Sequence, residues 1–327
     1  MQKKPTIAQL KKYLRKYNPL NLSGASFKLV SAHNHIHYRL KKNEKTYCLR
    51  MINPENYRHK EWITMDEEFA ILKALESTHL SPKPYYVDLK KFDIPLIIQE
   101  FISPIKCFNT IEMPSKEQLQ GVAKAIALLN TQDITPSNFP FLEKYTHYTY
   151  SSSFIKWQKR LFSIEQSNQK DVLNWIRKIE KITSKAKTIL EKSESLLEET
   201  DYVFSFDAAH GGNTYWIKKE NKVVFLDWQK VSYGDPSFTL ARFLVAMGKK
   251  KGQEVSKVNK TIMLEAYLKQ RNVPNFEKLL NARIFERQVS DLVWVLWHYV
   301  KSKKRKSVEK ATSIVVRYEM IRKKLLT

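Results

Sequence analysis

Residues 205–213 read SFDAAHGGN, and residues 225–229 read FLDWQ. An apolar run ends in the first stretch and delivers Asp207 to a loop that holds two glycines and Asn213, while the second stretch ends a β-type run at Asp227. Phosphoryl transfer needs Mg²⁺ held beside the phosphates and a carboxylate that orients the attacking hydroxyl. Two carboxylates and one amide at this spacing therefore suggest a kinase.

The segments between these motifs predict a hairpin. Residues 214–217 and 223–226 have strand patterns, and they flank the polar turn at 218–222. If the turn centres near Glu220, Asn213 and Asp227 face each other at the open end, where paired Cα atoms are about 4.5–5.5 Å apart. We therefore expect the amide and the carboxylate to share one metal site.

These three side chains have different expected roles. Asn213 and Asp227 are hard oxygen ligands of the kind that Mg²⁺ prefers, and one carboxylate plus one amide suffices when the nucleotide supplies further oxygens. Asp207 is then the candidate base. Each residue taken alone would be an ordinary loop or strand-end residue, so the hypothesis rests on the combination.

The motifs resemble the catalytic segment of the aminoglycoside phosphotransferase and choline kinase superfamily. The family pattern has His-Gly-Asp, then Asn, then a strand that ends in Asp-Trp-Glu or Asp-Phe-Glu, and its Gly-Asp-Pro corresponds to residues 234–236. The chain departs from this pattern at 205–206, where Ser-Phe replaces His-Gly, at Gln229 in place of an acid, and at Thr239 in place of a second aspartate. The resemblance implies a protein-kinase-like fold and transfer of a phosphoryl group from ATP.

One departure leaves two interpretations open. Residues 210–213 match the family's His-Pro-Gly-Asn block without a gap, which places Ala208 at the catalytic position and Asp207 one residue early. Either a one-residue insertion restores Asp207 as the base, or the chain is a pseudokinase that binds nucleotide or serves as an interaction protein.

The N-terminal third supplies the other parts of a kinase. Residues 27–30, 35–40 and 46–51 predict three antiparallel strands, and 66–75 predicts an amphipathic helix. The family resemblance implies that Arg50 on the third strand contacts nucleotide phosphates and pairs with Glu68 on the helix. For each residue alone, a solvated surface charge is the competing interpretation.

A buried strand at 95–102 resembles the hinge of the family. The resemblance implies that adenine binds to main-chain groups at Gln99, Glu100, Phe101 and Ile102. The phosphate-covering turn at 31–35 contains no glycine, and no Gly-rich loop ends in Lys-Ser or Lys-Thr, which excludes the P-loop NTPases.

We expect a two-lobed α+β fold of the protein-kinase type, with a small antiparallel-sheet N-lobe at 1–102 and a mainly helical C-lobe at 103–327 that includes the catalytic hairpin. Helical periodicity predicts helices at 118–129, 154–164, 171–197, 239–247, 261–270, 276–301 and 307–325. Substrate specificity in the family is built on such helices. The stretch 291–299 resembles the tryptophan-rich helix of choline kinases, so Asp291, Trp294 and Trp297 are candidate acceptor-binding residues. Core packing is the competing interpretation of the two tryptophans.

Composition limits the class of protein. The chain has 327 residues and 43% hydrophobic content, enough for two lobes with cores. It has no apolar run of ~18 residues and no apolar secretion core at its N-terminus, so we expect a cytoplasmic protein with no membrane span. Cys48 and Cys107 are expected as reduced, buried thiols, and exposure is expected for the alternating histidines at 33–37.

The net charge of +24 is large for a small-molecule kinase. Lysine runs at 249–251 and 301–306 would attract nucleic acid or an anionic surface. A solvated, lysine-rich surface is the favoured explanation of the charge, because no nucleic-acid-binding motif accompanies it. The favoured function is phosphorylation, dependent on ATP and Mg²⁺, of a hydroxyl on a small molecule such as an aminoglycoside, choline, ethanolamine, a sugar or an amino alcohol. A pseudokinase and, more weakly, a basic nucleic-acid-associated protein are the alternatives.

Overall fold

A computed structural model describes residues 4–55, 63–103, 106–108, 114–147, 149–165, 170–247, 255–301 and 312–326. The chain forms two compact units. Unit 1 contains residues 1–108 and 213–231, and unit 2 contains residues 109–212 and 232–327. This grouping differs from the sequence-based division at residue 102, which assigned the catalytic hairpin to the helical part.

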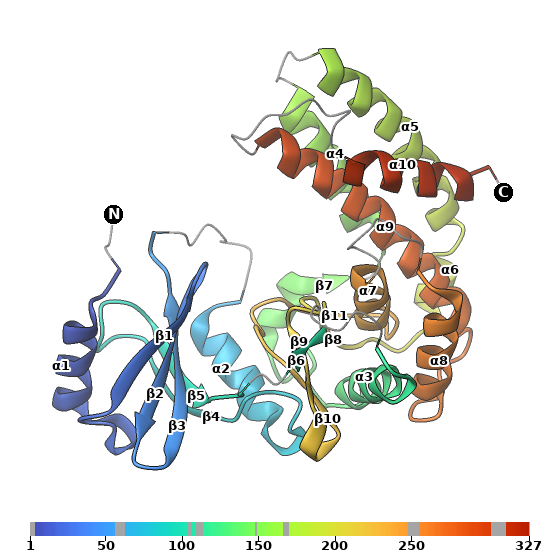
Figure 1. The fold of residues 1–327 in the computed structure, drawn as a ribbon. Coiled ribbons are helices and arrows are strands. Elements are labelled where there is room, and N and C mark those ends of the chain that lie inside the picture. Colours follow the sequence, from blue (N-terminus) through green and yellow to red (C-terminus); the bar gives the residue numbers. More distant parts are fainter. Residues whose placement is uncertain are drawn as a thin grey trace. The chain divides into compact units, whose positions relative to one another are not determined.

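Unit 1 is built around a five-stranded antiparallel sheet with the strand order β1-β2-β3-β5-β4 (Figure 1). The strands are β1 (Ser26–Ala32), β2 (His35–Lys42), β3 (Lys45–Ile52), β4 (Pro84–Asp88) and β5 (Leu96–Glu100). The three strands expected from the N-terminal sequence are present, and each extends a little beyond its expected ends.

Two helices lie against this sheet, α1 (Ile7–Tyr17) and α2 (Met65–Ala74). Side chains alternate along β3, so Leu49 and Met51 share a buried core with Leu10 of α1. Arg50, between them, points to the other face and pairs with Glu68 of α2. The alternation of one strand therefore separates the hydrophobic face of the sheet from its charged face.

The catalytic hairpin forms in unit 1 from β9 (Thr214–Ile217) and β10 (Lys222–Phe225), and β9 also pairs with β6 (Lys106–Cys107). Segment 213–231 contacts the rest of unit 1 through the pairing with β6, the bond from Phe225 N to Leu80 O at 2.8 Å and the Arg50–Asp227 ion pair. The expected register is wrong by one residue. Phe225 pairs with Thr214, and the next main-chain bond runs from Leu226 N to Asn213 O at 2.9 Å.

The physical reason for the register is the turn. Asn221 adopts the left-handed conformation, with φ of 50°, and this ends the turn one residue earlier than expected. Lys222 therefore joins β10. Asn213 faces Leu226, and Asp227 lies one position beyond the paired end of the hairpin.

Unit 2 is mainly helical, and its three-stranded sheet has the order β7-β11-β8. The strands are β7 (Thr146–His147), β8 (Val203–Phe206) and β11 (Val231–Gly234), which begins at the unit boundary. The helices are α3 (Lys116–Leu129), α4 (Ser151–Glu165), α5 (Lys170–Glu191), α6 (Ser195–Glu198), α7 (Phe238–Met247), α8 (Lys257–Leu268), α9 (Phe276–Lys301) and α10 (Thr312–Lys324).

The helices of unit 2 occur close to where the periodicity predicts them, with two differences. The helix expected at 171–197 ends at Glu191, and the separate short helix α6 follows. The first five residues of the helix expected at 307–325 lie outside the described residues. A single core joins α4, α5, α9 and α10, with Trp157, Ile179, Leu292 and Ile314 fully or almost fully buried.

None of the helices in the described ranges is long and apolar enough to span a bilayer. The lysine run at 249–251 and most of the run at 301–306 fall on residues outside those ranges, so the structure adds nothing about them.

Candidate active site

The centre of the site in unit 1 is Arg50, whose side chain is 2% exposed. Its Nη1 contacts the Glu68 carboxylate, and its Nη2 lies 3.1 Å from Asp227 Oδ1. Glu68 is equally buried, whereas Asp227 is 43% exposed. The structure therefore brings together three of the residues that the sequence singled out, from β3, α2 and the end of β10.

The electrostatic environment keeps Arg50 charged. Burial alone would lower its pKa, but the carboxylates of Glu68 and Asp227 outweigh burial and raise the pKa above its ordinary value. Burial raises the pKa of Glu68, and the adjacent Arg50 opposes that shift. A buried cation with two acidic partners on different elements fixes the positions of β3, α2 and β10 relative to one another.

The residues around Arg50 fit a bound phosphate and a divalent cation. In the described part of unit 1, Arg50 Nε is buried without a hydrogen-bond partner, and Asp227 Oδ2 has no partner either. Asp227 also holds a left-handed backbone, with φ of 68°, which turns the chain just after β10. No group of three acidic, histidine or cysteine side chains suited to a metal occurs among the described residues. Mg²⁺ needs only one or two protein carboxylates when phosphates supply further ligands.

Two histidines beside this cluster are more buried than the sequence analysis expected. His37 lies directly across from Arg50 in the β2–β3 pair, and its Nδ1 is 2.8 Å from Ser31 Oγ. His35 is 5% exposed, with Nε2 at 2.7 Å from Gln229 Nε2. The expectation of exposed histidines is therefore wrong for these two positions, because both rings find polar partners inside unit 1.

Burial, reinforced by the positive charge of Arg50, lowers the pKa of His37 to about 4. Asp227 opposes the shift without cancelling it. His37 is consequently neutral at pH 7, and it can accept or donate a hydrogen bond without adding charge beside Arg50.

The turn between β1 and β2 is held by a side chain in place of glycine. Asn53 Nδ2 donates to His33 O at 2.6 Å, and Asn53 N donates to Asn34 O at 2.9 Å. Asn53 is 2% exposed. These bonds fix the turn at 31–35, which contains no glycine and which the sequence analysis expected to cover the phosphates.

The four hinge candidates differ in what their main chain can do. Gln99 lies within β5, between β3 and β4, and pairs with residues on both sides. Glu100 N donates to Lys83 O at 2.8 Å. Phe101 and Ile102 follow the last residue of β5 and lie outside its pairing ladder. The main chain of these two residues is therefore better placed than that of Gln99 to receive a ligand.

Asp207 belongs to unit 2, where it follows the buried strand β8. Its Oδ1 accepts a hydrogen bond from Ser232 Oγ at 2.6 Å, and its Oδ2 lies 4.0 Å from His147 Nε2. The Asp207 side chain is 23% exposed, whereas Ala208 is 3% exposed. Asp207 is therefore the loop side chain that a ligand can reach, although Ala208 holds the aligned position of the motif.

His147 lies close to Asp207 but stays neutral. Its ring stacks on Phe238 with centroids 5.6 Å apart. Burial lowers its pKa, Asp207 opposes the shift, and Arg283 adds to it. A neutral imidazole leaves the Asp207 carboxylate without a cationic partner at that oxygen.

Buried hydrogen bonds position the Asp207 loop. Phe206 N donates to Thr239 Oγ1 at 2.9 Å, so Thr239 anchors the end of β8. Asn130 Nδ2 donates to Phe204 O at 2.8 Å, and Tyr267 OH donates to Asn130 Oδ1 at 2.8 Å.

The acceptor candidates on α9 have separate neighbours. Asp291 is 3% exposed and pairs with Arg287 at 2.8 Å. Trp294 is 40% exposed and stacks on His298, whereas Trp297 Nε1 donates to Ser163 Oγ at 2.9 Å. The two indoles therefore make different contacts and do not enclose a common space.

Sequence reasoning missed Ser232, His147, His37 and Arg242. The position of His37 opposite Arg50 could have been derived from strand alternation and pairing. Ser232 and His147 meet Asp207 only through the packing of β7, β8 and β11, which no local pattern indicates. Cys48 is buried, and burial raises its pKa to about 12, which agrees with the expectation that it is no nucleophile.

Comparisons with known proteins place the fold. No protein-family model and no curated protein matches the chain. Solved structures do match it over almost their whole length. The ethanolamine kinase of Plasmodium vivax has a TM-score of 0.66 at 14% identity, covering 96% of this chain and 88% of that one.

Two further structures lead to the same fold. Spectinomycin phosphotransferase, solved with ADP and spectinomycin, has a TM-score of 0.64 at 16% identity, covering 97% of this chain and 95% of that one. The choline kinase of Streptococcus pneumoniae has a TM-score of 0.63 at 14% identity, covering 97% and 99%. The chain therefore has the two-lobed α+β fold of these small-molecule kinases, as the sequence predicted.

The environment of His37 predicts a pH effect on stability. The folded pKa lies below that of the unfolded chain, so the unfolded state binds the proton first and stability falls as the pH drops from about 6.5 toward 4. Between pH 7.0 and 4.5 we expect the free energy of unfolding of His37→Gln to fall by about 2–3 kcal/mol less than that of the wild type. Urea unfolding at pH 7.0 and 4.5 measures it, with His79→Gln as the control. An equal loss in wild type and His37→Gln would show that His37 titrates normally.

Proposed function

We propose that the chain is a phosphotransferase that moves the γ-phosphoryl group of ATP to a hydroxyl of a small molecule, with Mg²⁺ as the metal. The observation that carries this proposal is the buried Arg50, paired with Glu68 and with the exposed Asp227. The fold shared with ethanolamine, choline and aminoglycoside kinases supports it.

Unit 1 would bind the nucleotide. Arg50 would contact phosphate oxygens, for which its buried Nε is an unused donor. Asp227 and Asn213 would hold Mg²⁺, which neutralises phosphate charge when bound. Phe101 and Ile102 would receive adenine through their main chain, with Gln99 and Glu100 supporting them from β5.

Unit 2 would activate the acceptor. Ser232 fixes one oxygen of Asp207, which leaves Oδ2 to orient the attacking hydroxyl and take its proton. The nearby His147 is neutral, so it does not hold that oxygen in an ion pair. The bond that forms joins the acceptor oxygen to the γ-phosphorus, the bond that breaks joins that phosphorus to ADP, and the hydroxyl proton goes to Asp207.

Replacement of the base tests the catalytic assignment. Asp207→Asn can still accept the hydrogen bond from Ser232, so we expect the fold and nucleotide affinity to persist while kcat falls about 10²- to 10⁴-fold. The measurement is transfer from labelled ATP to a panel of amino alcohols, sugars and aminoglycosides. Asp201→Asn, an exposed carboxylate just before β8, is the matched control and should keep full activity.

Two outcomes would contradict this assignment. Undiminished turnover by Asp207→Asn would show that another group is the base. Binding of Mg-ATP to the wild-type chain without transfer to any acceptor would indicate a pseudokinase, in line with Ala208 at the aligned position.

The charges on α7 and α9 bear on the choice of acceptor. The acids that could attract a cation already have partners: Asp235 binds Arg283 at 2.6 Å, Glu286 accepts from Ser153 and Ser290, and Asp291 binds Arg287. Arg242 differs, because its Nε has no hydrogen-bond partner among the described residues. Burial and Arg287 lower the pKa of Arg242 to about 10, with Asp207 opposing, so it remains a cation.

The paired acids and the cationic Arg242 together favour an uncharged or anionic polyol as the acceptor over choline or a polycationic aminoglycoside. We expect Arg242→Gln to lower kcat/KM for an anionic acceptor by about tenfold, because a charge-assisted hydrogen bond contributes about 1.5–3 kcal/mol. Arg287→Gln is the contrasting variant, since it would release Asp291 and shift the preference toward cations. The ratio of kcat/KM for choline to kcat/KM for a sugar acid is compared among the wild type, Arg242→Gln and Arg287→Gln. The same ratio in all three proteins would rule out this role of Arg242.

A further inference from the structure

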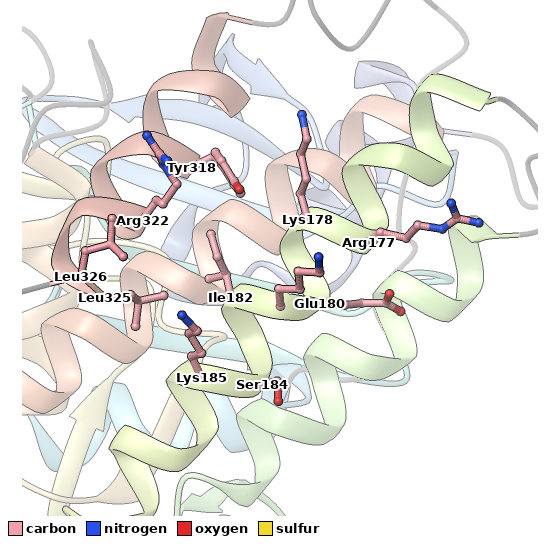
Figure 2. A pocket seen from close by; sticks show the side chains of 11 residues that line it. Arg177, Lys178, Glu180, Ile182, Ser184, Lys185, Tyr318, Arg322, Leu325 and Leu326 are labelled. Atoms are coloured by element: carbon pink, nitrogen blue, oxygen red, sulfur yellow. The ribbon is translucent and has the colours of Figure 1, made fainter.

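A groove on unit 2 lies between α5 and the C-terminal end of α10 (Figure 2), and its lining includes none of the residues proposed for catalysis. Its volume is 770 Å³. Helix α5 contributes one side through residues 177–185, and α10 with the two residues after it contributes the other. The whole groove belongs to one compact unit, so its shape depends only on the packing of these two helices.

The rim of the groove is strongly cationic. Five of its eleven lining residues are Lys or Arg and one is acidic, whereas Lys and Arg make up 57 of the 327 residues of the chain. The charge is therefore concentrated here beyond the basic average of the sequence. The five cations are Arg177, Lys178, Lys181, Lys185 and Arg322.

Three of these cations are not neutralised by the protein. Arg177, Lys181 and Lys185 are exposed, and in the described part of the chain none of them has an ion-pair partner. By contrast, Arg322 pairs with Glu319 at 2.9 Å, and Lys178 lies over the Trp175 ring at 4.8 Å. The unpaired cations recur at about every fourth position of α5, so they form a row about 12 Å long.

The floor of the groove is apolar. Ile182 is 4% exposed and lies at its base, and Leu325 and Tyr318 are half-buried beside it. Leu326 is 70% exposed at the edge of the groove, next to this apolar floor. The groove therefore presents an apolar strip next to a row of cations.

We propose that this groove binds an acidic amphipathic segment of a partner protein. Carboxylates of the segment would pair with Arg177, Lys181 and Lys185, and an apolar side chain would lie on Ile182 and against Leu326. A helical segment with acids four residues apart matches the repeat of the cations along α5. The residues that line the groove include none of the proposed nucleotide or acceptor residues, so the proposal holds whether or not the chain is a kinase.

The observations favour a peptide over other anions. A bilayer surface cannot enter a concave groove, whereas one turn of a helix can place a side chain in it. Nucleic-acid binding combines phosphate contacts with exposed aromatic platforms, but Tyr318 is occupied edge-on by Trp175, with ring centroids 5.4 Å apart. The aliphatic floor fits a leucine-type side chain better than a base.

Fluorescence anisotropy with a labelled synthetic peptide tests the proposal on the full-length chain. The peptide is a helix with Glu at every fourth position and Leu on the adjoining face. We expect Lys181→Glu/Lys185→Glu to weaken its binding at least about tenfold at ~0.1 M salt. Leu326→Ser should weaken it roughly threefold, because it removes apolar contact area. The control is Lys124→Glu/Lys159→Glu, which makes the same charge change at exposed sites on α3 and α4 and should alter binding less than about twofold.

Comparison ligands make the test specific. The same peptide with Gln in place of Glu, and a scrambled peptide of equal charge, should both bind at least about tenfold more weakly. Equal binding of the scrambled peptide, or equal losses in the two double variants, would reduce the effect to net charge and overturn the proposal. It would also be overturned if an RNA oligonucleotide or phosphatidylserine vesicles bound through Lys181 and Lys185 while the acidic peptide did not.

Discussion

A single buried guanidinium organises unit 1. Arg50 cannot remain charged inside the sheet without acidic partners, and it finds one on α2 and one at the end of β10. Removing Glu68, the buried partner, costs about 3–5 kcal/mol, whereas removing Asp227 costs less, because Asp227 is partly exposed to solvent and Glu68 still compensates the Arg50 charge. The constraint therefore ties together a strand, a helix and a hairpin that are far apart in sequence. It also leaves Asp227 partly exposed and, among the described residues, the buried Nε of Arg50 without a hydrogen-bond partner.

The acceptor residues follow a different principle. The Asp207 carboxylate accepts a hydrogen bond from the neutral Ser232 hydroxyl and lies near the neutral His147 imidazole, so neither of these neighbours neutralises its charge. Asp235 and Asp291 are paired with arginines of α9, and Glu286 accepts hydrogen bonds from hydroxyls. Most of these charged side chains thus pair with one another. Under the proposed function, three charged groups, Asp207, Asp227 and Arg242, can still bind a ligand. In unit 2 one of these groups is the cation Arg242, so the proposed acceptor is uncharged or anionic, unlike choline and the aminoglycosides.

Much of this could be predicted from sequence where a local pattern and a pairing rule coincide. Strand and helix patterns predicted the elements that carry Arg50 and Glu68, the family resemblance implied that the two residues pair, and the hairpin pattern placed Asn213 and Asp227 near each other. The prediction was wrong in register because the left-handed Asn221 shortens the turn by one residue, and a one-residue change in a hairpin shifts every partner. Ser232 and Arg242 were not predicted, because their roles depend on packing between distant elements. The grouping of 213–231 with unit 1 was not predicted, because it involves contacts between residues far apart in sequence, including the pairing with β6, a strand of two residues that has too little sequence to be recognised.

The central claim is that the carboxylate beside Arg50 holds the metal of a bound nucleotide. A crystal structure of the chain with Mn²⁺ and a non-hydrolysable ATP analogue measures this directly, because the anomalous signal locates the metal independently of the surrounding density. We expect a metal within coordination distance of Asp227, with a phosphate oxygen in contact with Arg50. A nucleotide bound elsewhere, or a metal that contacts neither Asp227 nor Asn213, would contradict it.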